Sequence, residues 1–131
     1  DLRSGRLVLC RDHFGIKPLY YTRSPKSGRL LFASEIKALL QDADVVARPD
    51  EQLVFEYLMH GMHEHRPETF FEGIWHVPAA SWVEVPLGAG PGEAAEAGAG
   101  PSRSALPATA YWQPELRQDG TIQRVVFPQR V

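Results

Sequence analysis

The chain has 131 residues, enough for one domain of ordinary size with a single modest core. Its 14 basic and 16 acidic residues give a formal net charge of −2, so no basic surplus favours nucleic acid or an anionic membrane surface as a partner. A single cysteine excludes an internal disulfide, and no apolar run approaches the roughly 18 residues of a membrane span, so we expect a soluble, cytoplasmic protein.

The first predicted element is an apolar strand over residues 6–11. Leu7, Val8, Leu9 and Cys10 form an unbroken apolar run, which predicts burial on both faces of a sheet. Cys10 lies inside this run and carries no free amine, so we interpret it as a small buried apolar residue and not as a nucleophile. Residues 1–5 read as a hairpin turn whose first strand is missing from the chain.

A shaped turn follows at residues 12–18. Asp12 can accept hydrogen bonds from turn amides, Gly15 can take a positive φ, and Pro18 fixes the entry to a strand at 19–22. Arg11 and Asp12 could form an ion pair with a functional role. We favour the alternative in which Asp12 caps the turn while Arg11 packs its stem and pairs locally.

Turn residues at 24–28 predict a hairpin that returns as a strand at 30–32. Ser34 then offers an N-cap oxygen to a short helix, and Glu35 suits the positive end of the helix dipole. Ile36, Leu39 and Leu40 have helical spacing.

The longer predicted helix begins after Asp50, which serves as its cap, and ends at Gly61. An apolar stripe at helical spacing predicts its buried face, formed by Leu53, Val54, Tyr57 and Leu58.

Three histidines lie close together after this helix. His60, His63 and His65, with Glu64 among them, are ligand types for zinc or nickel. No second ligand cluster is available to close a tetrahedral site, so we favour a solvated histidine-rich loop.

Two further strands are predicted at 71–77 and 81–85, on either side of a turn at 78–80. The three tryptophans could form a platform for a sugar or a base, but their strand positions favour packing in the core or on a sheet face; they are Trp75, Trp82 and Trp112.

The composition changes abruptly at residue 86. Residues 86–110 are rich in Gly, Ala, Pro, Ser and Glu, which predicts a flexible insertion between two strands of a hairpin. Tyr111-Trp112 returns to strand-like composition, and 115–131 is a divergent tail of unassigned origin. We therefore predict three parts: a folded domain at 1–85, the insertion at 86–110, and a final strand with tail or linker at 111–131.

Several motifs together resemble a known family. An Arg-Asp turn at 11–12, a Gly-Ile-Lys-Pro-Leu-Tyr-Tyr strand at 15–21 and an Ala-Ser-Glu helix entry at 33–35 follow one another in the later part of the glutaminase domain of glutamine-dependent asparagine synthetases. The resemblance covers roughly residues 1–85 and 111–112, with further matches at 49–50, 55–58, 69–74 and 77–78. It marks Arg11, Asp12, Gly15, Pro18, Ser34 and Glu35 as residues of the family's structural motifs.

The resemblance implies an α+β fold, namely part of an N-terminal-nucleophile hydrolase domain with antiparallel sheet packed against helices. Such class II amidotransferases hydrolyse glutamine with an N-terminal cysteine whose own amine is the base. The family's glutamine-holding motifs would lie before Asp1 and its ATP-pyrophosphate loop beyond this chain. We therefore expect no catalytic, cofactor-binding or metal-binding residue here, with ATP and magnesium used only by the intact parent.

The function implied for the parent is conversion of glutamine to ammonia and ATP-dependent transfer of that ammonia to activated aspartate. Its partners would be the synthetase domain of the same protein, with a homodimer left open. Ile16 and Lys17 are candidates for a place beside the ammonia channel, where the apolar Ile16 suits a wall and Lys17 must point elsewhere.

Two alternatives remain: a non-catalytic relic or interaction module, and part of another class II enzyme that acts on a peptide or antibiotic precursor. Because a truncated sheet exposes a strand edge and an apolar face, we also expect the isolated chain to be marginally stable or aggregated.

Overall fold

The computed structural model describes residues 3–62, 64–87, 105–116 and 122–123. Its elements, in chain order, are strands β1 (Arg6–Cys10), β2 (Tyr20–Arg23) and β3 (Leu30–Ala33), helices α1 (Ile36–Leu39) and α2 (Glu51–His60), and strands β4 (Ile74–His76), β5 (Ser81–Pro86), β6 (Ala108–Ala110), β7 (Glu115–Leu116) and β8 (Ile122–Gln123).

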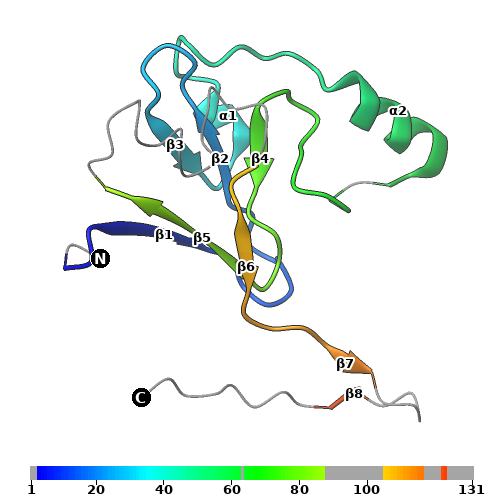
Figure 1. Ribbon diagram of the computed structural model, residues 1–131. Helices are drawn as coiled ribbons and strands as arrows, with labels where there is room; N and C mark the ends of the chain where they lie inside the picture. Colours follow the sequence, from blue (N-terminus) through cyan, green and yellow to red (C-terminus); the bar gives the residue numbers. More distant parts are fainter. Residues whose placement is uncertain (1–2, 63, 88–104, 117–121, 124–131) are drawn as a thin grey trace.

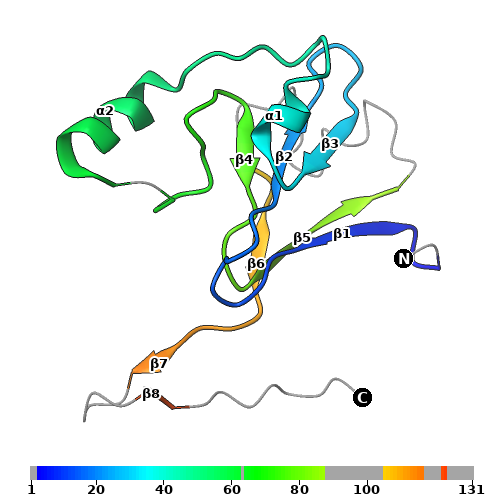
Figure 2. The ribbon, with the colours of Figure 1, turned by 180° about the vertical axis from the view of Figure 1, so that it is seen from behind.

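The strands form two antiparallel three-stranded sheets, in the orders β1-β5-β6 and β3-β2-β4, and a separate β7-β8 pair. Figure 1 shows the first sheet below the second, with α1 beside β2 and β3. Turning the molecule by 180° shows that α2 is set apart from both sheets, beyond β4 (Figure 2). Antiparallel sheets with few helices place the domain in the α+β class, as predicted.

The core lies between the two sheets. Its buried side chains come from strands of both sheets and from the segment that joins β4 to β5; they are Leu9, Tyr21, Trp75, Val77, Val83 and Val85. Tyr21 and Trp75 stack with their ring centroids 5.9 Å apart. The prediction that Trp75 packs in the core is confirmed.

Strand β1 is buried on one face, not on both as its unbroken apolar run predicted. Leu9 is buried, but Val8 is 46% exposed and Cys10 is also exposed. Side chains alternate between the two faces of the β1-β5-β6 sheet, so Leu9 packs on the core while Val8 and Cys10 lie on the face directed away from it. The interpretation of Cys10 as a buried residue is therefore wrong.

The entry to α1 also differs from the prediction. Glu35, and not Ser34, is at the N-cap position, where it has an extended backbone (φ −135°, ψ 134°) and makes no side-chain cap hydrogen bond. Its carboxylate pairs instead with Lys37, at 2.6 Å. The helix has only four residues, so its position depends on packing against β3 more than on a cap.

Helix α2 has both predicted ends. Asp50 Oδ1 accepts a hydrogen bond from the Leu53 amide at 2.9 Å, and Gly61 is in the left-handed region with φ 67°. Its predicted apolar stripe is only partly buried: Leu53 is buried, whereas Leu58 is 75% exposed and Tyr57 is also exposed. The helix lies away from the sheets (Figure 2), and Tyr57 meets Phe70 edge-on with their ring centroids 5.3 Å apart.

The insertion predicted at 86–110 is too long at its C-terminal end, and its central residues 88–104 lie outside the described residues. Residues 108–110 form β6, which pairs with β5, and Ala105 and Leu106 pack against the core. The Leu106 amide donates a hydrogen bond to Tyr21 Oη at 2.9 Å. The strand predicted at Tyr111-Trp112 thus lies just before these residues, because the ladder with β5 ends at Ala110.

Candidate functional site

The turn between β1 and β2 is held by the side chain of its first residue. The Asp12 carboxylate accepts hydrogen bonds from the backbone amides of Ile16 and Lys17, both at 3.0 Å, and the Gly15 amide donates to the Asp12 carbonyl at 3.0 Å. The Lys17 amide, followed by that of Ile16, holds the pKa of Asp12 below its ordinary value. The prediction that Asp12 caps this turn is confirmed.

The base of this turn is tied to the rest of the domain by backbone groups. The Arg11 amide donates to the Ser81 carbonyl at 3.0 Å, and the Ala80 amide donates to the Asp12 carbonyl at 2.9 Å. Tyr111 Oη donates to the Arg11 carbonyl at 2.7 Å. Residues from the start of β5 and from beyond β6 therefore fix the two residues that begin the turn.

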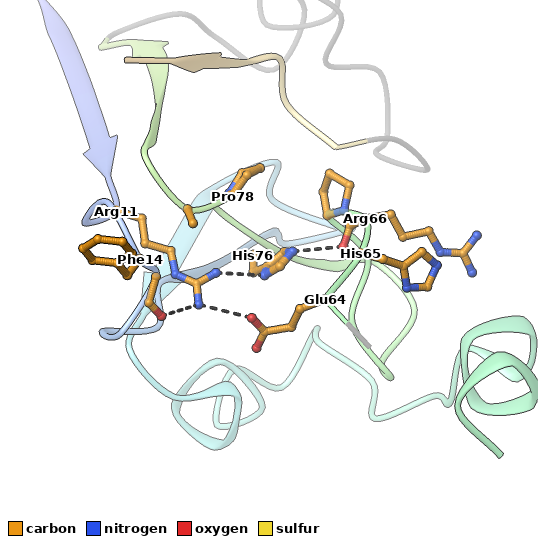
Figure 3. Close-up of a pocket in the computed structure, with 10 residues that line it drawn as sticks. Arg11, Phe14, Glu64, His65, Arg66, His76 and Pro78 are labelled. Atoms are coloured by element: carbon orange, nitrogen blue, oxygen red, sulfur yellow. Dashed lines mark hydrogen bonds and ion pairs between the residues drawn. The ribbon is translucent and has the colours of Figure 1, made fainter. Parts of the chain in front are cut away.

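The Arg11 side chain, only 5% exposed, reaches from the turn to the loop before β4. Nη1 donates to the Val77 carbonyl and contacts His76 Nδ1, both at 3.0 Å, and Nη2 donates to the Gly15 carbonyl at 2.8 Å. Nη2 also lies 3.4 Å from Glu64 Oε2. Figure 3 shows the guanidinium between His76 and Glu64. We call Arg11, Gly15 and His76, with the Val77 carbonyl, the arginine clasp.

The sequence favoured local pairing for Arg11, but the side chain also makes long-range contacts. Its contact with Gly15 is local, but its other partners lie 53 to 66 residues further along the chain. Its guanidinium is directed to these groups and not to Asp12. This arrangement joins the turn after β1 to the segment around β4, which belongs to the other sheet.

The clasp requires a glycine at position 15. Gly15 has φ +63°, and a Cβ placed there would lie 3.1 Å from three Arg11 side-chain atoms, Nε, Cζ and Nη2. Equal distances to these atoms mean that the added carbon would press on the face of the guanidinium. Both the left-handed backbone and the close approach favour glycine.

His76 is buried and uses both ring nitrogens. Nε2 lies 2.9 Å from the Arg66 carbonyl, which can only accept, so Nε2 carries a proton. Nδ1 faces the Arg11 Nη1 donor, so it accepts and carries none. Burial lowers the pKa of His76 below its ordinary value, and the nearby Arg11 charge acts in the same direction. The ring is therefore neutral at neutral pH.

An open pocket of about 180 Å³ lies beside the clasp. Arg11, Gly15 and His76 form one side of it, and residues 64–67 form another. Glu64 has a positive φ of 56°, unusual for a residue with a side chain, and half of its side chain is exposed. Opposite charges meet at the pocket, because the Arg11 guanidinium contacts the Glu64 carboxylate there, whereas the Arg66 side chain points away from Glu64 (Figure 3) and pairs with Glu56.

Aromatic side chains surround the outer face of the turn. His13 meets Tyr111 and Trp112 edge-on, with ring centroids 5.2 and 5.4 Å apart, and Phe14 meets Trp112 at 5.5 Å. Tyr111 stacks on Trp82 at 6.0 Å. Packing on a sheet face, as predicted, is thus found for Trp82 of β5, whereas Trp112 lies beyond β6 and packs against the turn.

Of the residues proposed for an ammonia channel, Ile16 is 73% exposed at the tip of the turn and Lys17 is also exposed. The sequence reasoning named Glu64 only among the ligand types of the histidine-rich loop, and it did not single out His76. A signal for His76 was present, because a histidine inside the apolar run 74–77 must find hydrogen-bond partners if that strand is buried. Glu64 gave no such signal, since it lies in a polar loop.

The histidine-rich loop shows no metal site among its described residues, and His63 lies outside them. No group of three or more His, Cys, Asp or Glu side chains in the described part of the chain is arranged to hold a metal ion. His65 Nε2 lies 3.1 Å from Glu56 Oε2, and Arg66 Nη2 is at the same distance from that oxygen. These contacts join α2 to the loop. No helix among the described residues is long and apolar enough to span a membrane.

Fold and site together define an α+β domain of antiparallel sheets joined by a buried arginine. A family model described as a glutamine amidotransferase domain matches residues 1–91 of the chain. The chain therefore belongs to the glutamine amidotransferase domain family.

Two curated proteins of Bacillus subtilis strain 168 are similar to this chain. Asparagine synthetase [glutamine-hydrolyzing] 3 is 35% identical over 80 residues, which cover 61% of this chain and 13% of that protein. Asparagine synthetase [glutamine-hydrolyzing] 2 is 34% identical over 91 residues, which cover 66% of this chain and 12% of that protein. The chain thus matches only about an eighth of the length of these relatives.

Proposed function

We propose that the chain is the later portion of a class II glutaminase domain with the N-terminal-nucleophile hydrolase fold, inside a longer glutamine-hydrolysing asparagine synthetase. That protein would hydrolyse glutamine to glutamate and ammonia and transfer the ammonia to aspartate activated by ATP. The observation that carries the proposal is the family match over residues 1–91, supported by two similar proteins whose names include glutamine hydrolysis.

In this proposal the nucleophile comes from outside residues 1–131. A class II nucleophile needs a cysteine whose own free amine acts as the base. Cys10 is the last residue of β1, where it pairs with Trp82 of β5, and its nitrogen belongs to a peptide bond. The proposal assigns ATP and magnesium to the synthetase domain, which would be this domain's partner in the cytoplasm.

Within that protein, Ile16 would border the path that ammonia follows between the two domains. The Asp12 carboxylate fixes the backbone of the turn, so Ile16 presents an exposed apolar side chain at a defined place. An apolar wall does not hydrogen-bond ammonia and therefore does not retain it. Lys17 contributes its backbone amide to the turn and would keep its ammonium away from the path.

The experiment uses glutamine labelled with ¹⁵N in its amide, together with aspartate, ATP and magnesium. The longer polypeptide that contains this chain should release glutamate and form asparagine with the label, whereas the chain alone should form neither product. Glutamate release by the chain alone would overturn the proposal. Transfer of the label to an acceptor other than aspartate would favour another class II enzyme, and no hydrolysis by the longer polypeptide would favour a relic.

A second measurement tests the place of Ile16. In the longer polypeptide, Ile16→Asp should lower the amount of asparagine formed per glutamate released. A carboxylate holds ammonium at the wall of the path, so less ammonia reaches the aspartate and more is lost to solvent. Lys26→Asp, another exposed position, is the matched control and should leave this ratio unchanged. Equal ratios in the two variants would exclude Ile16 from the path.

A further inference from the structure

The arginine clasp depends on one protonation state of His76. Nη1 of Arg11 can only donate, so Nδ1 of His76 must be free of a proton to accept from it. Nε2 is already committed as donor to the Arg66 carbonyl. Addition of a proton to Nδ1 would set two donors against each other at 3.0 Å and place a positive charge beside a buried guanidinium.

The clasp holds the tip of the turn but not its base. The base is fixed by backbone hydrogen bonds to Ser81 and Ala80 and by the Tyr111 hydroxyl. At the tip, the Gly15 carbonyl accepts from Nη2 of Arg11 at 2.8 Å, and the guanidinium face lies against Gly15. Displacement of Arg11 would therefore free the Gly15 carbonyl and loosen the tip, while the base and the hydrogen bonds from the Ile16 and Lys17 amides to the Asp12 carboxylate stay in place.

We propose that His76 is a positioning residue: as a neutral Nε2–H ring it aligns Arg11 on the Gly15 carbonyl, so that its protonation frees this carbonyl and loosens the tip of the turn that carries Ile16. The importance of this for ammonia transfer rests on the proposed function. The alignment itself does not.

The charged groups around His76 influence the pH at which its ring gains a proton and the clasp opens. Arg11 faces the ring from the position after β1. Glu64 and Arg66 face it from the loop before β4, as does Glu68, which forms a β-bridge with Trp75. The two carboxylates favour the charged ring, whereas burial and Arg11 oppose it, with burial the largest influence on the pKa of His76. The clasp is therefore closed at neutral pH and opens in acid.

Two substitutions separate positioning from simple packing. His76→Asn keeps an acceptor near the position of Nδ1, loses the bond to the Arg66 carbonyl, and does not titrate. His76→Gln keeps a donor near the position of Nε2 and loses the acceptor for Arg11. A residue that only fills space would be affected similarly by both changes.

The test is NMR of the uniformly ¹⁵N-labelled chain between pH 4 and 8. We expect the Nε2–H tautomer for His76 at neutral pH, and the Gly15 and Ile16 amide signals should move with the midpoint of the imidazole. The protection of the Gly15 amide against exchange, corrected for the intrinsic pH dependence of exchange, should fall by about tenfold in acid, because the loss of the bond from Arg11 to the Gly15 carbonyl loosens the tip. In His76→Asn the signals should not follow this midpoint, and in His76→Gln they should resemble the acid form at every pH.

An Nδ1–H tautomer, or the same titration of Gly15 and Ile16 in His76→Asn, would overturn the proposal. If His76→Gln does not fold, the wild-type titration and His76→Asn still decide between the two outcomes. The longer polypeptide separates this inference from the proposed function: a loop that titrates with His76, with no change in asparagine formed per glutamate, supports positioning by His76 and counts against the channel role of Ile16.

Discussion

Gly15 lies so close to Arg11 that a Cβ would come within 3.1 Å of the guanidinium. Gly15→Ala should therefore lower the free energy of unfolding by about 2–3 kcal/mol, from the left-handed backbone and the displaced Arg11 together. Gly5→Ala is the matched control, because Gly5 has nearly the same φ, +61°, and open space around its Cβ. It should lower the free energy by only about 1 kcal/mol. Equal effects in urea unfolding would show that Arg11 does not press on this site.

The pH dependence of stability should report the buried ring of His76. The folded pKa of His76 lies below its ordinary value, so just below pH 6.5 the unfolded chain binds a proton that the folded chain excludes. Stability is thus complete above this ordinary value and falls as the pH drops toward the folded pKa. Urea unfolding at a series of pH values should show this slope in the wild type and a smaller slope in His76→Asn. A slope of the opposite sign would contradict the assignment.

The cap of α2 should contribute measurably to stability. Asp50→Ala removes the acceptor for the Leu53 amide and should lower the free energy of unfolding by about 1 kcal/mol. Ser34→Ala is the control at the entry to α1, where the N-cap residue is Glu35 and makes no side-chain cap bond. It should change stability by less than about 0.5 kcal/mol. A larger loss for Ser34→Ala than for Asp50→Ala would mean that Ser34 is the cap after all.

The Tyr111 hydroxyl should hold the segment after β6 to the start of the turn. Tyr111→Phe removes the 2.7 Å bond to the Arg11 carbonyl but keeps the ring that stacks on Trp82, and it should lower stability by about 1 kcal/mol. Tyr111→Leu also removes the stacking and should be worse by about another 1 kcal/mol. Thermal unfolding followed by tryptophan fluorescence measures both. No difference between the two variants would show that the ring contributes nothing.

The sequence predicted the local features of this fold well. The turn at Asp12, the positive φ of Gly15, the hairpin between β2 and β3 and both ends of α2 follow from the chemistry of single residues, which acts over a few positions. Features that depend on distant neighbours were predicted poorly. The exposure of Val8 and Cys10 reflects their place on the face of the sheet directed away from the core, which no local pattern reports.

The candidate site shows the same division. The sequence marked Arg11, Asp12 and Gly15, but Arg11 finds His76 65 residues along the chain, and this pairing exists only once the two sheets are packed together. The segment 105–110 was assigned to the insertion by composition, although Leu106 binds the Tyr21 hydroxyl and 108–110 extend the sheet. Composition could not show that a few residues of such a segment have a strand to pair with.

The most direct test of the account is glutamate release from glutamine by the longer polypeptide that carries Cys10→Ala. Because Cys10 is held in the ladder between β1 and β5 and has no free amine, the rate should equal that of the parent protein, within about twofold. Cys10→Ser should behave in the same way. Loss of more than about a hundredfold in a Cys10→Ala protein that is still folded would make Cys10 the nucleophile and would contradict the assignment of this chain to the non-catalytic later portion of a glutaminase domain.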